Sequence, residues 1–116
     1  MPATFREEFE RWWDALIVEG DRQRNPYVPD QGLRARLDDL PEGGAEREQI
    51  YEVLLEWLAS PDDLRWQPAL GLLLRERVAA APAAMRAAVS PANTKDKADF
   101  KETFLDVAAE LEQALK

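Results

Sequence analysis

Apolar residues recur along this chain at the three-to-four-residue spacing of an α-helix, and no segment alternates with the two-residue period of a half-buried strand. The first such stretch, residues 4–19, places its apolar side chains within an arc of about 100° and its charged residues on the other side. Thr4 and Glu7 have the spacing of a capping box, and Gly20 predicts the end of the helix. The apolar positions of this stretch are Phe5, Phe9, Trp12, Trp13 and Leu16.

Five further stretches predict helices, and segments rich in Pro, Gly, Asp and Ser separate them. Asp30 is a candidate cap for the first of these helices, and Ser60 for the third. Pro68 lies inside the third, so that helix either begins near Pro68 or bends there. The five stretches are residues 31–40, 45–59, 62–80, 82–89 and 95–115. We therefore predict an all-α fold, a compact bundle or short stack of five to six helices, in a single domain over residues 1–116.

The composition removes most catalytic options. The 116 residues include no cysteine and no histidine, which excludes disulfides, the usual zinc ligand sets and the common Ser–His and Cys–His pairs. No apolar run approaches the roughly 20 residues that span a bilayer. The first residues have neither the basic nor the apolar region of a signal peptide. We expect a cytoplasmic protein that is not an enzyme and has no cofactor, no metal and no contact with membranes.

Carboxylates are abundant, and an enzyme that uses carboxylates alone is the remaining catalytic alternative. Such chemistry needs two acids that converge across a cleft, whereas the acids here fall opposite the apolar positions of their helices. Asp62 and Asp63 lack the glycine and the distal glutamate of a calcium loop. Gly43 and Gly44 are not followed by the lysine of a phosphate-binding loop. Solvated helix faces and turns explain these residues better than catalysis does.

The charge is negative and uneven. Twenty-three acids and fifteen bases give a net charge of −8. Residues 1–58 hold 14 acids and 7 bases, whereas residues 59–116 hold 9 acids and 8 bases. A negative chain is a poor match for nucleic acid, whose phosphates need a basic surface. It attracts basic protein partners and speeds their encounter, although acidity also serves solubility alone.

The best-defined acidic feature is the glutamate stripe, which consists of Glu48, Glu52 and Glu56. These residues repeat at every fourth position, opposite the apolar face of the helix predicted over residues 45–59. No lysine or arginine follows any of them at the fourth position, so the stripe is not neutralised along its own helix. Like charges at this spacing cost ~0.2–0.5 kcal/mol per pair. A basic partner would account for that cost, and a solvated face is the alternative.

Further acids and two tryptophans complete the candidate binding surface. Asp38, Asp39 and Glu42 are candidates to extend the glutamate stripe. Trp13 is one of two adjacent tryptophans whose side chains point about 100° apart on a helix, so we expect one ring to be partly exposed. Trp66 lies beside a turn. Core packing is the alternative for each ring, but an exposed ring beside acids would anchor a protein partner.

One stretch resembles a known structural style. Residues 51–70, YEVLLEWLASPDDLRWQPAL, resemble a HEAT-like helical hairpin, with an apolar helix, a short turn that contains aspartates, and a helix rich in Ala and Leu. Small acidic helical chains of this style are similar to the immunity proteins of bacterial toxin systems. This resemblance implies a short HEAT-like stack and a cognate toxin whose active site is covered by an acidic face. It rests on pattern and not on a motif, so it assigns no binding residue.

We therefore expect a non-catalytic protein-binding protein, an immunity protein that neutralises a basic toxin domain through its acidic face. The expected assembly state is a monomer or a weak homodimer, and the partner is a basic protein. A secretion chaperone or adaptor that binds an effector segment in an apolar groove is one alternative. A phage-type regulatory or anti-defence inhibitor is another.

Overall fold

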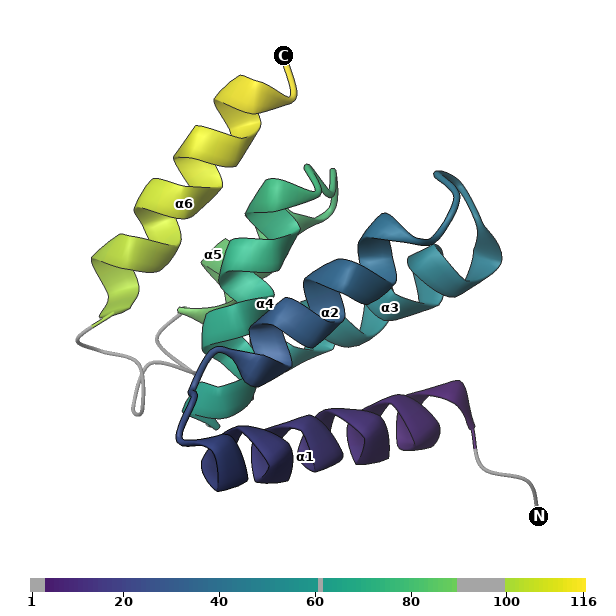
Figure 1. Cartoon of the computed structure of the whole chain (residues 1–116). Coiled ribbons are helices and arrows are strands. Elements are labelled where there is room, and N and C mark those ends of the chain that lie inside the picture. Colours follow the sequence, from purple (N-terminus) through teal and green to yellow (C-terminus); the bar gives the residue numbers. More distant parts are fainter. Residues whose placement is uncertain (1–3, 61, 90–99) are drawn as a thin grey trace. The chain divides into compact units, whose positions relative to one another are not determined.

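The computed structural model describes residues 4–60, 62–89 and 100–116, and within these ranges the chain is all-α and has no strand (Figure 1). The prediction of an all-α fold with five to six helices is confirmed. None of the helices in the described ranges combines the length and the apolarity that a bilayer crossing needs. The helices are α1 (Phe5–Gln23), α2 (Val28–Asp38), α3 (Ala45–Trp57), α4 (Asp63–Arg75), α5 (Ala81–Ala88) and α6 (Lys101–Ala114).

The chain divides into two compact units, residues 1–50 and 51–116, and the division falls inside α3. In the first unit, α2 packs against α1 after a tight turn. In the second unit, α6 packs against α5 and α4, which also contact one another (Figure 1). The assignment of one domain to residues 1–116 stays a prediction.

Helix α1 begins as predicted but ends later. The side chain of Thr4 accepts a hydrogen bond from the backbone N–H of Glu7 at 3.2 Å, which caps the helix. The prediction that Gly20 ends the helix is wrong, because α1 continues through Gly20. A Cβ on Gly20 would lie 2.8 Å from the carbonyl oxygen of Asn25, so the following turn needs glycine there for space. The helix ends instead at Gln23, because its C-cap, Arg24, has a left-handed backbone with φ 54°.

Helix α2 begins earlier than predicted. Its first residue is Val28, so Asp30 lies within the first turn and does not cap the helix as expected. Asp30 instead forms an ion pair with Arg34 one turn later, at 3.0 Å. Gly32 allows α2 to approach α1 closely, because a Cβ there would lie 2.9 Å from the side chain of Leu16. The α1–α2 pair therefore depends on one small residue at the contact.

Helix α4 differs from its prediction at both ends. Its cap is Asp62, which accepts a hydrogen bond from the N–H of Leu64 at 2.9 Å. Ser60 was expected to cap this helix but does not. Its hydroxyl instead accepts a hydrogen bond from the N–H of Asp62 at 3.1 Å, in the turn before α4. Pro68 lies inside the helix, so α4 does not begin there. The helix ends before residue 80 because Arg77 takes a left-handed backbone with φ 53°.

The remaining helices follow the apolar pattern closely. Helix α3 begins at the predicted residue, and α5 begins and ends within one residue of its prediction. The predicted start of the last helix, residues 95–99, lies outside the described residues. The start of α3 is tied to the end of α2 by Arg47, whose guanidinium donates hydrogen bonds to the carbonyls of Leu37 and Leu40. A cation at the C-terminal end of a helix is favourable because it meets unpaired carbonyls and the negative end of the helix dipole.

Most of the buried side chains lie on the apolar helix faces that the spacing predicts, and they include the two tryptophans that were expected at the surface. In the first unit they include Phe9, Trp13, Leu33, Leu37 and Ile50. In the second unit they include Val53, Leu54, Trp57, Leu58, Trp66, Leu70, Leu73, Met85, Phe104, Ala108 and Leu111. Apolar burial of this extent is the main stabilising contribution to a small helical fold.

Candidate partner-binding surface

The glutamate stripe lies on the solvent side of α3. Glu48, Glu52 and Glu56 are all exposed, and their four-residue spacing places them on one side of this helix. The opposite side is buried and carries residues such as Val53 and Trp57. The predicted separation of α3 into an acidic and an apolar face is therefore confirmed.

The three carboxylates of the stripe are not equally available to a cation from a partner. Glu56 interacts with other groups of the protein. The carboxylates of Glu48 and Glu52 have no hydrogen bond or ion pair within the described ranges. These two residues are one helical turn apart, so they form an exposed pair of like charges. The part of the stripe that can accept an external cation is therefore Glu48 and Glu52.

The three acids predicted to extend the stripe lie around the end of α2. Asp38 is the last residue of α2, Asp39 is its C-cap, and Glu42 lies in the turn before α3; all three are exposed. The hydrogen bonds of Arg47 to the α2 carbonyls bring this end of α2 beside the first turn of α3. A guanidinium therefore shares this region with the acids and lowers its negative potential. The role of these three acids in binding stays a prediction.

The expectation that Trp13 and Trp66 anchor a partner is wrong. Their exposed fractions are 1% and 2%, so neither ring is accessible. The indole N–H of Trp66 donates to Asp63 Oδ1 at 2.8 Å, and its ring centre lies 5.3 Å from that of Phe104. A tryptophan that buries its apolar surface and satisfies its N–H is a core residue. The half-buried member of the adjacent pair is Trp12.

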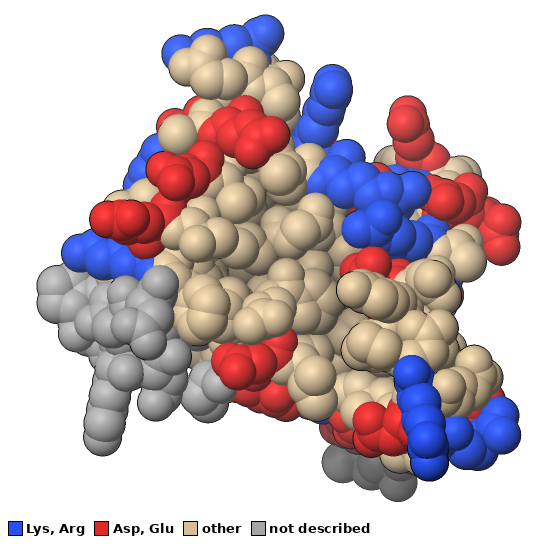
Figure 2. All heavy atoms as spheres, turned by 60° about the vertical axis from the view of Figure 1, so that its left-hand side comes forward, with Lys and Arg blue, Asp and Glu red and all other residues tan. Residues whose placement is uncertain are grey.

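A second set of exposed acids lies on α6 and was not proposed from the sequence as a site. We call Glu102, Asp106 and Glu110 the α6 acidic row. They are exposed at every fourth position and have no ion pair within the described residues. Figure 2 shows acidic side chains along this helix on the face in view. The four-residue spacing that identified the glutamate stripe could also have identified this row.

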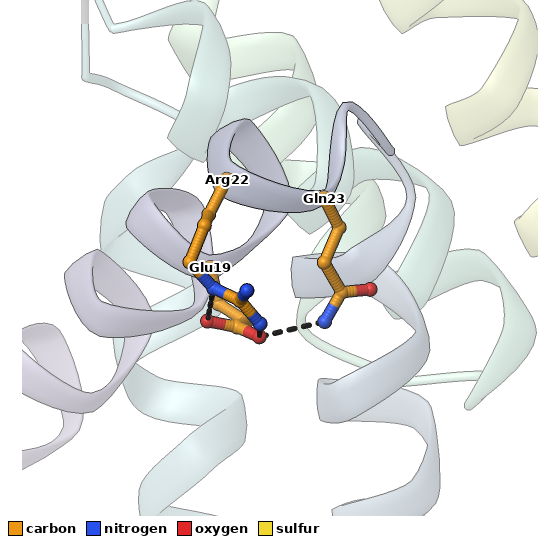
Figure 3. Close-up of polar contacts among 3 residues, drawn as sticks. All are labelled: Glu19, Arg22 and Gln23. Carbon is orange, nitrogen blue, oxygen red and sulfur yellow. Dashed lines mark hydrogen bonds and ion pairs between the residues drawn. The ribbon is translucent and has the colours of Figure 1, made fainter.

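Two half-buried carboxylates at the surface are already neutralised by neighbours. Near the end of α1, Glu19 accepts hydrogen bonds from Arg22 Nε at 2.9 Å and from Gln23 Nε2 at 2.6 Å (Figure 3). The bonds from Arg22 and then Gln23 lower the pKa of Glu19 to about 2. On α6, the hydrogen bond from Arg86 lowers the pKa of Glu112 below its usual value. Such acids are poor candidates for binding an external cation.

A cluster around Arg36 of α2 was not predicted at all. Its guanidinium lies over three rings of α1, with distances to the ring centres of 4.6 Å for Trp12, 5.5 Å for Phe9 and 5.9 Å for Phe5. It also forms an ion pair with Glu46 in the first turn of α3, at 3.4 Å. We call the three rings the aromatic row.

The sequence did contain a signal for this cluster. Arg36 follows Leu33 by three residues and precedes Leu40 by four, so it falls on the apolar face of α2. A cation at such a position must find partners for its charge, and aromatic faces together with a carboxylate supply them.

The comparisons with known proteins identify no relative. No protein-family model matches this sequence, no curated protein matches it, and no solved structure matches its fold. In the described part of the chain, no group of three acidic side chains is arranged to hold a metal ion. The function is therefore inferred from the surface chemistry, and the similarity to HEAT-like hairpins and immunity proteins stays a prediction.

Proposed function

We propose that this protein is a non-catalytic protein-binding protein that docks a basic protein partner on the glutamate stripe. The observation that carries this proposal is the exposed pair Glu48 and Glu52, whose carboxylates have no cation within the described residues. Two like charges one turn apart destabilise a helix slightly. Lysine or arginine side chains of a partner would relieve this repulsion and gain charge-assisted hydrogen bonds.

The charge of the whole chain supports the same partner class. The net charge of −8 attracts a basic protein at long range, which raises the association rate and makes binding weaker as salt increases. At short range, the helix face fixes where the partner's cations meet the acids. Because Glu48 and Glu52 lie one turn apart on a helix, the helical repeat sets the spacing of their carboxylates, and less order has to be gained on binding than in a loop.

The partner we propose is a toxin domain with a basic active site, such as a nuclease, and the protein is then its immunity protein in the bacterial cytoplasm. A nuclease needs a basic cleft to hold phosphates. An acidic helix that enters this cleft would occupy the cations that bind the substrate and so prevent catalysis. The acidic surface supports this assignment, and so does the similarity in style between small acidic helical chains of this kind and immunity proteins.

Charge reversal on α3, compared with an equal reversal on α6, tests this proposal. The partner to be used is a basic protein domain sought among the products of neighbouring genes and purified as a catalytically inactive variant. The variant E48K/E52K should bind it about 100-fold more weakly, which corresponds to roughly 2.7 kcal/mol. The control E102K/E110K changes the net charge by the same amount and should bind within about threefold of the wild type. Isothermal titration calorimetry at several salt concentrations measures both.

The two variants separate local docking from general attraction. Equal losses in both variants would show that only the net charge matters, and the assignment to α3 would then be wrong. Unchanged affinity in E48K/E52K would rule out the acidic-face mechanism and favour a chaperone that uses apolar contacts.

A further inference from the structure

The surroundings of Arg36 contain all the groups that recognise a guanidinium. The aromatic row supplies π-faces, and Glu46 supplies a carboxylate. Arginine binds such sites better than lysine because its planar cation stacks on rings and forms several hydrogen bonds in one plane. Helices α1, α2 and α3 each contribute one part of this arrangement, and all of it lies within residues 1–50.

The aromatic row is built independently of Arg36. Phe5, Phe9 and Trp12 follow one side of α1, and neighbouring ring centres are 5.9 Å and 5.5 Å apart. These contacts among the rings do not require the guanidinium. Helix α1 is capped by Thr4 at the end where the row begins, so the rings stand on an ordered element. The site is therefore expected to persist when its cation is removed.

The present cation is held in a way that permits exchange. The side chain of Arg36 is 26% exposed and that of Glu46 is 44% exposed, so solvent reaches the ion pair. Their distance of 3.4 Å is longer than the ≈ 2.7–2.9 Å of a strong charge-assisted hydrogen bond. Arg36 can therefore move into solvent without the loss of a tight two-point contact.

We propose that the aromatic row and Glu46 form an arginine-binding site that Arg36 fills in the isolated protein and that an arginine side chain of a protein partner enters in its place. The exchange replaces one guanidinium by another, so Glu46 stays neutralised and the rings stay covered. The displaced Arg36 becomes solvated on the surface of α2. This proposal does not depend on the glutamate stripe, because it involves none of the stripe residues.

The variant R36A empties this site and allows a direct test without a partner. N-acetyl-arginine amide is titrated, and the indole N–H resonance of Trp12 is followed by NMR after its assignment with W12F. We expect R36A to bind this probe about tenfold more tightly than the wild type, because Arg36 no longer competes. The control is R34A, which removes the same charge from α2 at the Arg34–Asp30 ion pair and should behave as the wild type.

N-acetyl-lysine amide separates guanidinium recognition from attraction of any cation. It should shift the Trp12 resonance of R36A much less than the arginine probe does. Equal binding of the two probes to R36A, or no gain over R34A, would overturn the proposal. If R36A proves unfolded by circular dichroism, R36K is used with the same two probes; it retains a cation but lacks the planar guanidinium, and it must also gain arginine binding. None of these results bears on the charge-reversal test of the stripe.

Discussion

Helices α3 and α6 carry the same surface pattern, and the structure makes them different. Each has three exposed acids at every fourth position and a buried apolar side. On α3, one acid of the stripe, Glu56, interacts with other groups, whereas all three acids of the α6 row are without an ion pair in the described part of the chain. Beside the row, however, Glu112 of α6 is bound by Arg86.

This difference shows that spacing identifies an acidic face but does not say which charges are available. Availability also depends on cations that come from other helices, such as Arg36 at Glu46 and Arg86 at Glu112. Both faces contain acids that could meet a basic partner. The position of α3 in the more acidic half of the sequence favours the stripe as the docking face, and the variants below test the two faces against each other.

The largest change in stability is expected from a substitution in the core, where α6 packs on Trp66. Trp66→Ala should lower the free energy of unfolding by roughly 3–5 kcal/mol, because it removes a buried ring and leaves a cavity. It also leaves Asp63 without the indole hydrogen bond. Urea denaturation followed by circular dichroism measures the change.

The control for Trp66 is Leu105→Ala on the exposed side of α6. Leu105 is 36% exposed, so its loss should change the unfolding free energy by less than about 0.5 kcal/mol. A comparable destabilisation by the two substitutions would contradict the assignment of Trp66 to the core and reopen a surface role for its ring.

A smaller change, this time an increase in the free energy of unfolding, is expected when the middle acid of the glutamate stripe or of the α6 acidic row is replaced by lysine. Glu52→Lys replaces two repulsive pairs by two attractive ones, and so does Asp106→Lys. Each should raise the unfolding free energy by roughly 0.5–1 kcal/mol at low salt. Thermal denaturation at low and high salt measures both, and the gain should shrink as salt increases.

The two substitutions differ in what they do to binding. Glu52→Lys should stabilise the protein and weaken the complex with the basic partner, whereas Asp106→Lys should stabilise it and leave the affinity unchanged. Gain of stability with loss of function is typical of residues kept for binding. The opposite outcome, with binding lost only in Asp106→Lys, would move the docking site from α3 to α6.

The smallest effect concerns an acid that is already neutralised. The pKa of Glu19 is lowered from 4.5 to about 2, so its ionised form is favoured in the folded state. The resulting stabilisation is present above pH 4.5 and is lost as the pH falls towards 2. Glu19→Gln should therefore melt slightly below the wild type at neutral pH, and the difference should disappear near pH 2. An NMR titration of the Glu19 carboxyl carbon checks the pKa, and a midpoint near 4.5 would contradict the bonds from Arg22 and Gln23.

Much of the fold could be predicted because apolar spacing reports directly on buried faces. The six helices, the capping role of Thr4 and the two faces of α3 all follow from local patterns. The errors lie at helix ends. Gly20 was expected to end α1 because glycine often does so, but here it makes room for the carbonyl of Asn25. The helix propensity of glycine describes one residue at a time. It therefore cannot predict that the backbone of Asn25, five residues later, comes close to Gly20.

The candidate sites were less predictable because they depend on contacts between helices. The exposure of the glutamate stripe followed from its own helix. The burial of Trp13 and Trp66 did not, because a ring beside charged neighbours in sequence can still be covered by another helix. The Arg36 cluster joins residues of α1, α2 and α3, and only the position of Arg36 on an apolar face hinted at it.

The sequence by itself determined the helical class, the acidic character and the absence of cysteine and histidine chemistry, because these depend on composition and on periodicity along one helix. The tertiary structure decided which tryptophans are buried, which carboxylates are paired and which cation lies on the aromatic row. These features depend on distances between side chains of different helices. Such distances arise when apolar faces pack together, and no local pattern specifies them.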